Sequence, residues 1–166
     1  MLRKGIVIAA LCLMPAMAHA QAAHGPWELT LGGSGNNGPN FNGFTAAANG
    51  SLGVFFTDAL ELSLRQSLAY SDLAGVGWNA STRIAADYHV PITDAFVVYG
   101  GANLGYVYGK GVRDTWEAAP EAGIKYFVNG TTFIYVSAEY EFFFKQGAGA
   151  FRNGQFLYGL GIGFRF

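Results

Sequence analysis

The sequence has little cysteine, little charge and no long apolar run beyond its first residues. Its only cysteine is Cys12, so the chain after residue 20 can hold neither a disulfide nor a thiolate metal site. Charged residues make up 13% of the chain, about half of the roughly 25% that soluble domains contain. After residue 20 no apolar, uncharged stretch reaches the about 18 residues that a membrane-spanning helix needs. If this apolar chain spans a membrane, it must do so with strands.

The first 20 residues have the pattern of an export signal. Two basic residues precede an apolar run over 5–14, and Ala18-His19-Ala20 is a small-x-small cleavage pattern. We predict a signal peptide over residues 1–20, a short segment over 21–26 and one domain over 27–166. Two of the ten basic residues lie in the leader, which leaves eight basic against eleven acidic residues. This negative net charge argues against nucleic acid as a partner.

Side chains alternate between apolar and polar with a period of two, which is typical of β-strands. From Leu60 to Tyr70, for example, large apolar residues occupy almost every even position and polar residues most odd ones. The pattern occurs eight times and predicts strands at 27–33, 44–56, 60–70, 78–90, 96–108, 116–128, 132–144 and 155–166.

Every charged residue of these strands falls on one of the two faces, and the other face is apolar. A soluble sandwich would also alternate, but its polar face would be rich in lysine and glutamate, whereas this one is sparse and rich in glycine. The sequence therefore predicts an all-β, eight-stranded antiparallel up-and-down transmembrane β-barrel, closed so that no strand edge is left unpaired. The charged face would line the lumen with Glu28, Glu61, Arg65, Arg83, Asp87, Glu117, Glu121, Lys125, Glu139, Glu141 and Arg165.

Connections between the strands alternate in length. Those at 57–59, 91–95 and 129–131 are short, and those at 34–43, 71–77, 109–115 and 145–154 are longer and polar or rich in glycine. Outer-membrane barrels have short periplasmic turns and longer outer loops, so both termini are expected on the periplasmic side. The tryptophans open strands near the two membrane interfaces, where aromatic girdles form, and we interpret them as anchors: Trp27, Trp78 and Trp116.

The leader, the eight alternating strands, the turn asymmetry and the ending Tyr158-Gly-Leu160-Gly-Ile162-Gly-Phe164-Arg-Phe166 together carry a resemblance. Over residues 21–166 the chain resembles the small outer-membrane β-barrel superfamily of Gram-negative bacteria, with its OmpA-type transmembrane domains and OmpX-type barrels. The resemblance implies contact with outer-membrane lipid and lipopolysaccharide, and periplasmic chaperones and the barrel-assembly machinery as partners during biogenesis. It implies that the last strand is the assembly signal, through Tyr158, Leu160, Ile162, Phe164 and Phe166. It leaves the oligomeric state open.

Pairing the strands across each turn places the lumen residues in rows. A turn at 57–59 sets Ser51 opposite Arg65, and the following hairpins then align Arg83, Asn103, Glu121 and Glu139. A neighbouring row contains Glu61, Asp87, Tyr99, Lys125 and Tyr135. Eight-stranded barrels are just wide enough for side chains to fill, so we expect both arginines to reach the two glutamates across the lumen, with Asn103 bridging and Lys125 near the second acidic row.

Three functions are open on this evidence. The predicted one is a non-enzymatic envelope structural or surface-interaction protein with a narrow lumen closed by the Arg/Glu network. The alternatives are a narrow, weakly cation-preferring pore or small-molecule conduit, and a lipid A-modifying enzyme built on Asp87 and His89, which lie at the wrong end of the barrel for that reaction. Gly33-Ser-Gly35-Asn-Asn-Gly38 resembles a nucleotide-binding loop but precedes no helix, so no cofactor and no metal are expected. Pro120, in mid-strand, should cause a bulge or a local break in the ladder.

Overall fold

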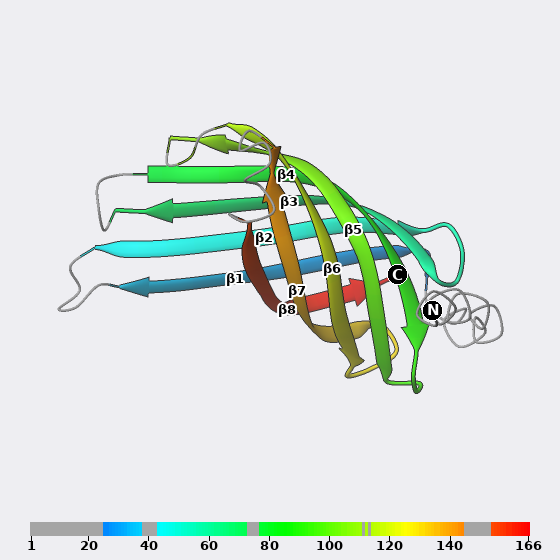
Figure 1. The fold of residues 1–166 in the computed structure, drawn as a ribbon. Helices are drawn as coiled ribbons and strands as arrows, with labels where there is room; N and C mark the ends of the chain where they lie inside the picture. The colour runs from blue at the N-terminus through cyan, green and yellow to red at the C-terminus, as the bar shows by residue number, and fades with distance from the viewer. Residues whose placement is uncertain (1–24, 38–42, 73–76, 111, 113, 145–153) are drawn as a thin grey trace, which may run out of the picture.

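Eight antiparallel strands form a closed barrel in which each strand pairs with its neighbour in the chain and β1 pairs with β8. The computed structural model describes residues 25–37, 43–72, 77–110, 112, 114–144 and 154–166 (Figure 1). The predicted signal peptide at 1–20 lies outside the described residues. The strands are β1 (Trp27–Asn37), β2 (Phe44–Phe55), β3 (Leu60–Ser71), β4 (Gly77–Pro91), β5 (Phe96–Gly109), β6 (Thr115–Phe127), β7 (Thr132–Phe143) and β8 (Gln155–Arg165).

The predicted all-β, eight-stranded architecture is confirmed, and the strand limits differ from the prediction mainly in β1. That strand continues to Asn37 instead of ending at residue 33, because the glycine-rich segment pairs with β2 as far as Asn37 opposite Phe44. The nucleotide-loop-like sequence thus begins within a strand. Within the described residues, no helix is long and apolar enough to cross a membrane.

The two ends of the barrel differ. The end that carries the three short connections is called the turn end, and the opposite one the loop end. The start of β1 and the end of the chain meet at the turn end, where Trp27 and Phe166 exchange two backbone hydrogen bonds of 2.9 Å. Both termini of the barrel therefore lie at the turn end, close together.

All three short turns share one geometry. The backbone N–H before each three-residue turn donates to the carbonyl after it, with N···O distances of 2.9, 2.8 and 2.9 Å at Phe56, Ile92 and Val128. The first turn residue accepts backbone N–H bonds on its side chain: Thr57, Thr93 and Asn129. The second turn is thus 93–95 and not the predicted 91–95.

This shorter turn moves the β4–β5 register by two residues from the predicted one. Asn103 lies opposite Ala85 and not Arg83, and Tyr99 lies opposite His89 and not Asp87. The β5–β6 register differs by two in the other direction, so Asn103 faces Ala119 on β6. The predicted pairs Ser51–Arg65, Arg65–Arg83 and Glu121–Glu139 are present.

Large apolar side chains cover the outside of the barrel, and the charged side chains of the strands point inward. Ile84 and Leu160 are 62% and 67% exposed on the outer face, whereas Glu28 and Asp87 are only 2% and 1% exposed. Of the eleven charged strand residues, all are buried except Arg65, which is partly buried. The predicted division of the two faces is therefore confirmed.

Glycines of β8 make room for large lumen side chains on the neighbouring strand. Phe133, fully buried, lies opposite Gly163, and Tyr135 lies opposite Gly161. A Cβ at Gly163 would stand 2.1 Å from the Phe133 ring, and one at Gly161 would stand 2.8 Å from the Tyr135 ring. The alternating glycines of the last strand are thus required by the bulk of β7.

Pro120 interrupts the ladder on one side only, so of the predicted bulge or local break the structure shows a break. Its pairing with Ala102 on β5 is continuous, but the pairs with β7 pass from Ala118–Phe142 directly to Glu121–Glu139. The register is the same on both sides of this gap, so the strand breaks locally without a bulge. The missing proline N–H accounts for the gap.

We expect Gly163→Ala to destabilise the barrel by about 1–3 kcal/mol, because the new methyl group would overlap the buried Phe133 ring. Gly130→Ala is the matched control, since nothing lies within 4 Å of a Cβ there. The folded fraction across a urea series in lipid vesicles can be read from the faster gel migration of unboiled barrels. Equal unfolding midpoints for the two variants would contradict the packing described for β7 and β8.

Candidate functional site in the lumen

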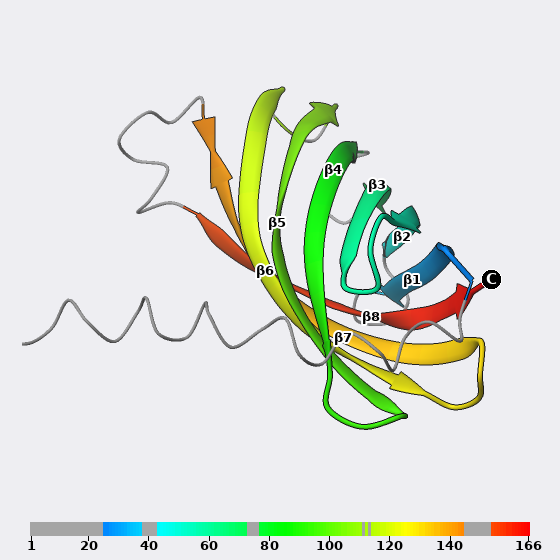
Figure 2. The same cartoon turned by 90° about the vertical axis from the view of Figure 1, so that its right-hand side faces the viewer.

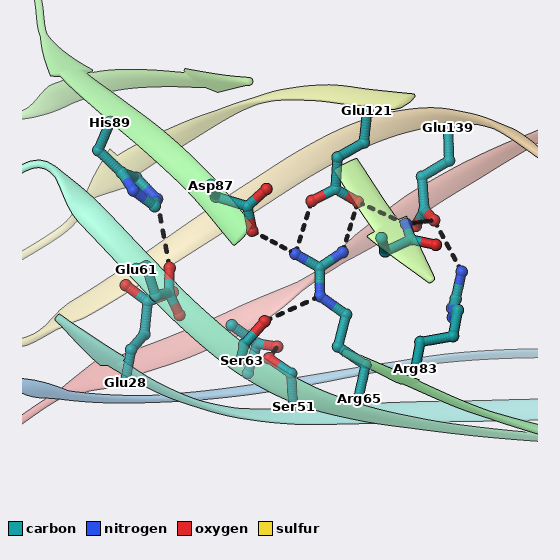
Figure 3. A network of polar contacts seen from close by, with 12 residues as sticks. Glu28, Ser51, Glu61, Ser63, Arg65, Arg83, Asp87, His89, Glu121 and Glu139 are labelled. Carbon is teal, nitrogen blue, oxygen red and sulfur yellow. Dashed lines mark hydrogen bonds and ion pairs between the residues drawn. The ribbon is translucent and has the colours of Figure 1, made fainter. Parts of the chain in front are cut away.

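Arg65 is the centre of a charged network that crosses the lumen. From β3 its guanidinium donates two hydrogen bonds to Glu121 on β6, of 2.5 and 2.6 Å, and one of 2.5 Å to Asp87 on β4. Its Nε donates to the Ser63 hydroxyl at 3.2 Å (Figure 3). A forked guanidinium that binds both oxygens of one carboxylate is geometrically specific and strong.

Arg83 forms a second arm from β4 to β7. Its Nη1 lies 2.7 Å from Glu139 and 3.5 Å from Glu141, and its Nε lies 3.8 Å from Glu117. The Asn103 amide joins the two arms, because its Nδ2 donates to Glu121 at 3.2 Å and to Glu139 at 2.8 Å. The adjacent cations Arg65 and Arg83 are thus neutralised by the adjacent carboxylates of Glu121 and Glu139 on the opposite wall.

Lys125 holds a separate group closer to the turn end. Its ammonium donates to Glu28 and to His89 Nε2, the latter at 2.8 Å, and lies 3.4 Å from Glu61. Because an ammonium only donates, His89 Nε2 is the acceptor and carries no proton. The His89 ring packs between Phe55 and Tyr99, with centroid distances of 5.0 and 5.2 Å.

An apolar cluster lies next to the Lys125 group at the turn end. It consists of the buried residues Val97, Phe127, Phe133 and Tyr135. The Lys125 ammonium stands 5.1 Å from the centroid of the Phe133 ring, within range of a cation–π interaction. Charged side chains and bulky apolar side chains thus fill this end of the lumen together.

The structure brings the eight predicted lumen residues into these two groups: Arg65, Arg83, Asn103, Glu121, Glu139 and Asp87 in the first, and Glu61 and Lys125 in the second. Asn103 reaches both glutamates although its predicted row position was wrong. The predicted network did not include Glu28, His89, Glu117 and Glu141. Their position on the charged face was visible, but their partners depend on barrel closure, which brings β1 close to β6.

Asp87 and His89, the pair on which an enzyme would depend, have separate partners. Asp87 forms an ion pair with Arg65, and His89 contacts Lys125 and Glu61. No hydrogen bond joins these two side chains. Glu61 Oε2 lies 3.4 Å from His89 Nε2, the same ring nitrogen that contacts Lys125.

Tryptophan and C-terminal residues lie on the outer face. Trp78 and Trp116 lie at the loop end, with ring centroids 6.4 Å from Tyr108 and 5.4 Å from Tyr106. Trp27 lies at the turn end. Of the predicted assembly signal, Tyr158, Leu160, Ile162 and Phe164 lie on the outward face of β8 and Phe166 ends the chain. The anchoring and assembly roles remain predictions.

A cavity of about 880 Å³ occupies the lumen from the Lys125 group towards the loop end. On one side it is bounded by the charged side chains of β3 to β7, and on the other by mostly small residues of β1 and β2 and by residues 155–160 of β8. Six carboxylates and three cationic side chains line it: Glu28, Glu61, Asp87, Glu117, Glu139 and Glu141, with Arg65, Arg83 and Lys125.

A closed eight-stranded barrel with an apolar outside and a charged lumen defines the class of small outer-membrane barrels. The chain belongs to the outer membrane protein beta-barrel domain family, whose sequence model matches residues 6–166. This membership assigns the protein to the outer membrane of Gram-negative bacteria.

Solved structures with the same fold come from several such proteins. The N-terminal β-barrel domain of OprF from Pseudomonas aeruginosa matches with 22% identity and a TM-score of 0.58, over 86% of this chain and 99% of that one. OprG from the same organism matches with 13% identity and a TM-score of 0.56, over 86% and 97%. Ail from Yersinia pestis matches with 17% identity and a TM-score of 0.55, over 86% and 99%. At these identities the likeness shows the fold. No curated protein matches the chain.

We expect Arg83→Ala to lower the free energy of unfolding by about 3 kcal/mol, or to raise conductance if water enters the space, because it leaves three buried carboxylates without their cation. The double variant Arg83→Ala/Glu139→Ala should lose less than the sum of the single variants, since the two residues interact directly. Ile84→Ala, on the outer face of the same strand, is the control.

Urea unfolding in vesicles and planar-bilayer recording measure the two effects. Additive losses, or an Arg83→Ala variant with unchanged midpoint and unchanged conductance, would show that Arg83 is not part of a closed network.

Proposed function

We propose that the protein is a non-enzymatic envelope barrel that seals its own lumen, and that it serves as a structural or surface-interaction protein of the outer membrane. The observation that carries this proposal is the pair of ionic arms across the lumen, Arg65 to Glu121 and Arg83 to Glu139. The ion pairs join opposite walls and narrow the lumen, and the cavity passes beside them only as far as the Lys125 group.

The turn end supports a sealed lumen independently. Lys125 binds Glu28 on the far wall, and the apolar cluster around Phe133 lies beside it. A water-filled path would need to displace aromatic side chains that are almost completely buried. In the proposed sealed barrel, the cavity towards the loop end is a cup with a closed base.

A narrow pore is the alternative that the charges define most clearly. The lumen carries seven acids and four bases: Glu28, Glu61, Asp87, Glu117, Glu121, Glu139 and Glu141 against Arg65, Arg83, Lys125 and Arg165. If the arms opened, the excess of carboxylates would favour cations. A sealed barrel and a cation-preferring pore therefore predict different electrical behaviour.

Planar-bilayer recording of the refolded protein distinguishes the two functions. The sealed barrel should give no unitary current in 1 M KCl at about 100 mV, because both ionic arms and the aromatic base obstruct the lumen. Heat-denatured protein in the same detergent controls for leakage caused by detergent alone. Reproducible cation-selective steps from the folded protein only would establish the pore and refute the sealed scaffold.

We further propose that the turn end, with both termini, faces the periplasm. The alternation of short and long connections supports this orientation. Single cysteines at Asn37 and Gly75 should then react with a membrane-impermeant maleimide on intact cells, and those at Asp58 and Gly130 should react only after the cells are opened. The opposite labelling pattern would invert the orientation.

A further inference from the structure

The barrel wall is incomplete between β1 and β8 towards the loop end. These strands pair from Glu28–Arg165 to Gly32–Gly161 and no further, although β1 continues to Asn37 and β8 begins at Gln155. The rest of β1 pairs only with β2, and the first half of β8 pairs only with β7. Figure 1 shows the two strands diverging, and Figure 2 shows β8 beside β1 only near the C-terminus. We call this opening, with edges at residues 33–37 and 155–160, the seam.

The seam connects the outer face with the lumen cavity. Gly33 and Ser34 from one edge and Leu157, Tyr158 and Leu160 from the other line the cavity. Tyr158 and Leu160 point outward and are 74% and 67% exposed. Unpaired strand edges at membrane depth are tolerated only where they line a polar cavity, and the cavity meets this requirement.

Three carboxylates that line this cavity each retain a buried oxygen without a hydrogen-bond donor. Glu28 Oε2, Asp87 Oδ1 and Glu117 Oε1 are buried and have no donor, and each residue is at most 2% exposed. Glu117 Oε1 lies 3.8 Å from Arg83 Nε, too far for a hydrogen bond. Together with the excess of carboxylates around the cavity, these acceptors favour a ligand that is cationic and rich in N–H donors.

The outer side of the seam is apolar, which defines the rest of the ligand. Phe156, Tyr158 and Leu160 project from the half of β8 that pairs only with β7. The Phe156 and Tyr158 rings stack with a centroid distance of 6.2 Å. The facing part of β1 carries only glycine, serine and asparagine from Gly33 to Asn37. An alkyl chain can therefore lie against β8 without meeting a bulky side chain on β1.

We propose that the seam and the adjoining cavity bind a single-chain amphipathic amine from the surrounding leaflet. Its ammonium group enters the cavity towards Glu117 and Glu141, and its alkyl chain leaves through the seam and lies along β8. The inference goes beyond the sealed-scaffold function, because it assigns a ligand site to the cup and requires no transport.

The probe for this site is octylamine, which is cationic at pH 7, with octanol and octanoate as neutral and anionic compounds of equal chain length. Isothermal titration into phosphatidylcholine nanodiscs that contain the barrel, corrected with empty nanodiscs, should show saturable binding of octylamine only. Glu117→Gln should weaken this binding about tenfold, because it removes the charge from a carboxylate that has one oxygen without a donor. Asp58→Asn, in the first short turn, is the matched control and should bind like the parent.

A disulfide across the seam tests the route of the alkyl chain. Gly33→Cys/Leu160→Cys continues the β1–β8 register one step beyond its last pair, and oxidation would close the seam. Saturable octylamine binding should be lost on oxidation and return on reduction. Leu31→Cys/Ile162→Cys links residues that are already paired and should bind octylamine in both states.

Three results would overturn the proposal. They are equal binding of octanol and octylamine, unchanged octylamine binding in Glu117→Gln, and unchanged binding in the oxidised Gly33→Cys/Leu160→Cys variant. The gel-migration assay shows that each variant is folded, so loss of binding can be separated from loss of structure.

Discussion

The constraint on which the structure depends is that a membrane offers no partners for backbone N–H and C=O groups. An all-strand chain satisfies it by closing its sheet, and here the two backbone bonds between Trp27 and Phe166 close the barrel at the turn end. Closure directs one face of every strand into a narrow lumen. Charged side chains that would be dispersed on an open sheet must therefore neutralise one another across it. The ionic arms of Arg65 and Arg83 are the consequence.

Large side chains in the lumen are distributed unevenly around the wall. Strands β3 to β7 supply the large and charged side chains, whereas β1, β2 and β8 supply mostly glycine, alanine, serine and asparagine. Near the turn end neighbouring side chains fill the space beside the glycines, as the Phe133 ring does beside Gly163. Towards the loop end the neighbouring side chains are smaller, such as Ser137 beside Gly159, and a cavity remains. The incomplete β1–β8 pairing lies on this lightly packed side of the barrel.

The charged lumen residues therefore differ in how many of their hydrogen-bonding groups have partners. Arg65, bound to both oxygens of Glu121 and to Asp87, has a complete set of partners, which suits a structural brace. Glu117 is more deeply buried but retains an oxygen without a donor. Among the charged groups of the lumen, those with unmet hydrogen bonds indicate where a ligand fits.

The sequence by itself determined the number of strands, the face that each charged residue occupies and the local break at Pro120, because these follow from a period of two and from the missing proline N–H. It also contained the signal for the β4–β5 register, since Thr-Asp-Ala occurs at both 57–59 and 93–95 and forms the same turn. Only the tertiary structure decided which charges meet. Lys125 binds Glu28 across 97 residues because closure places β1 and β6 on opposite walls of a narrow lumen. The seam was equally inaccessible to sequence reasoning, because the extent of β1–β8 pairing depends on how the whole sheet twists to close.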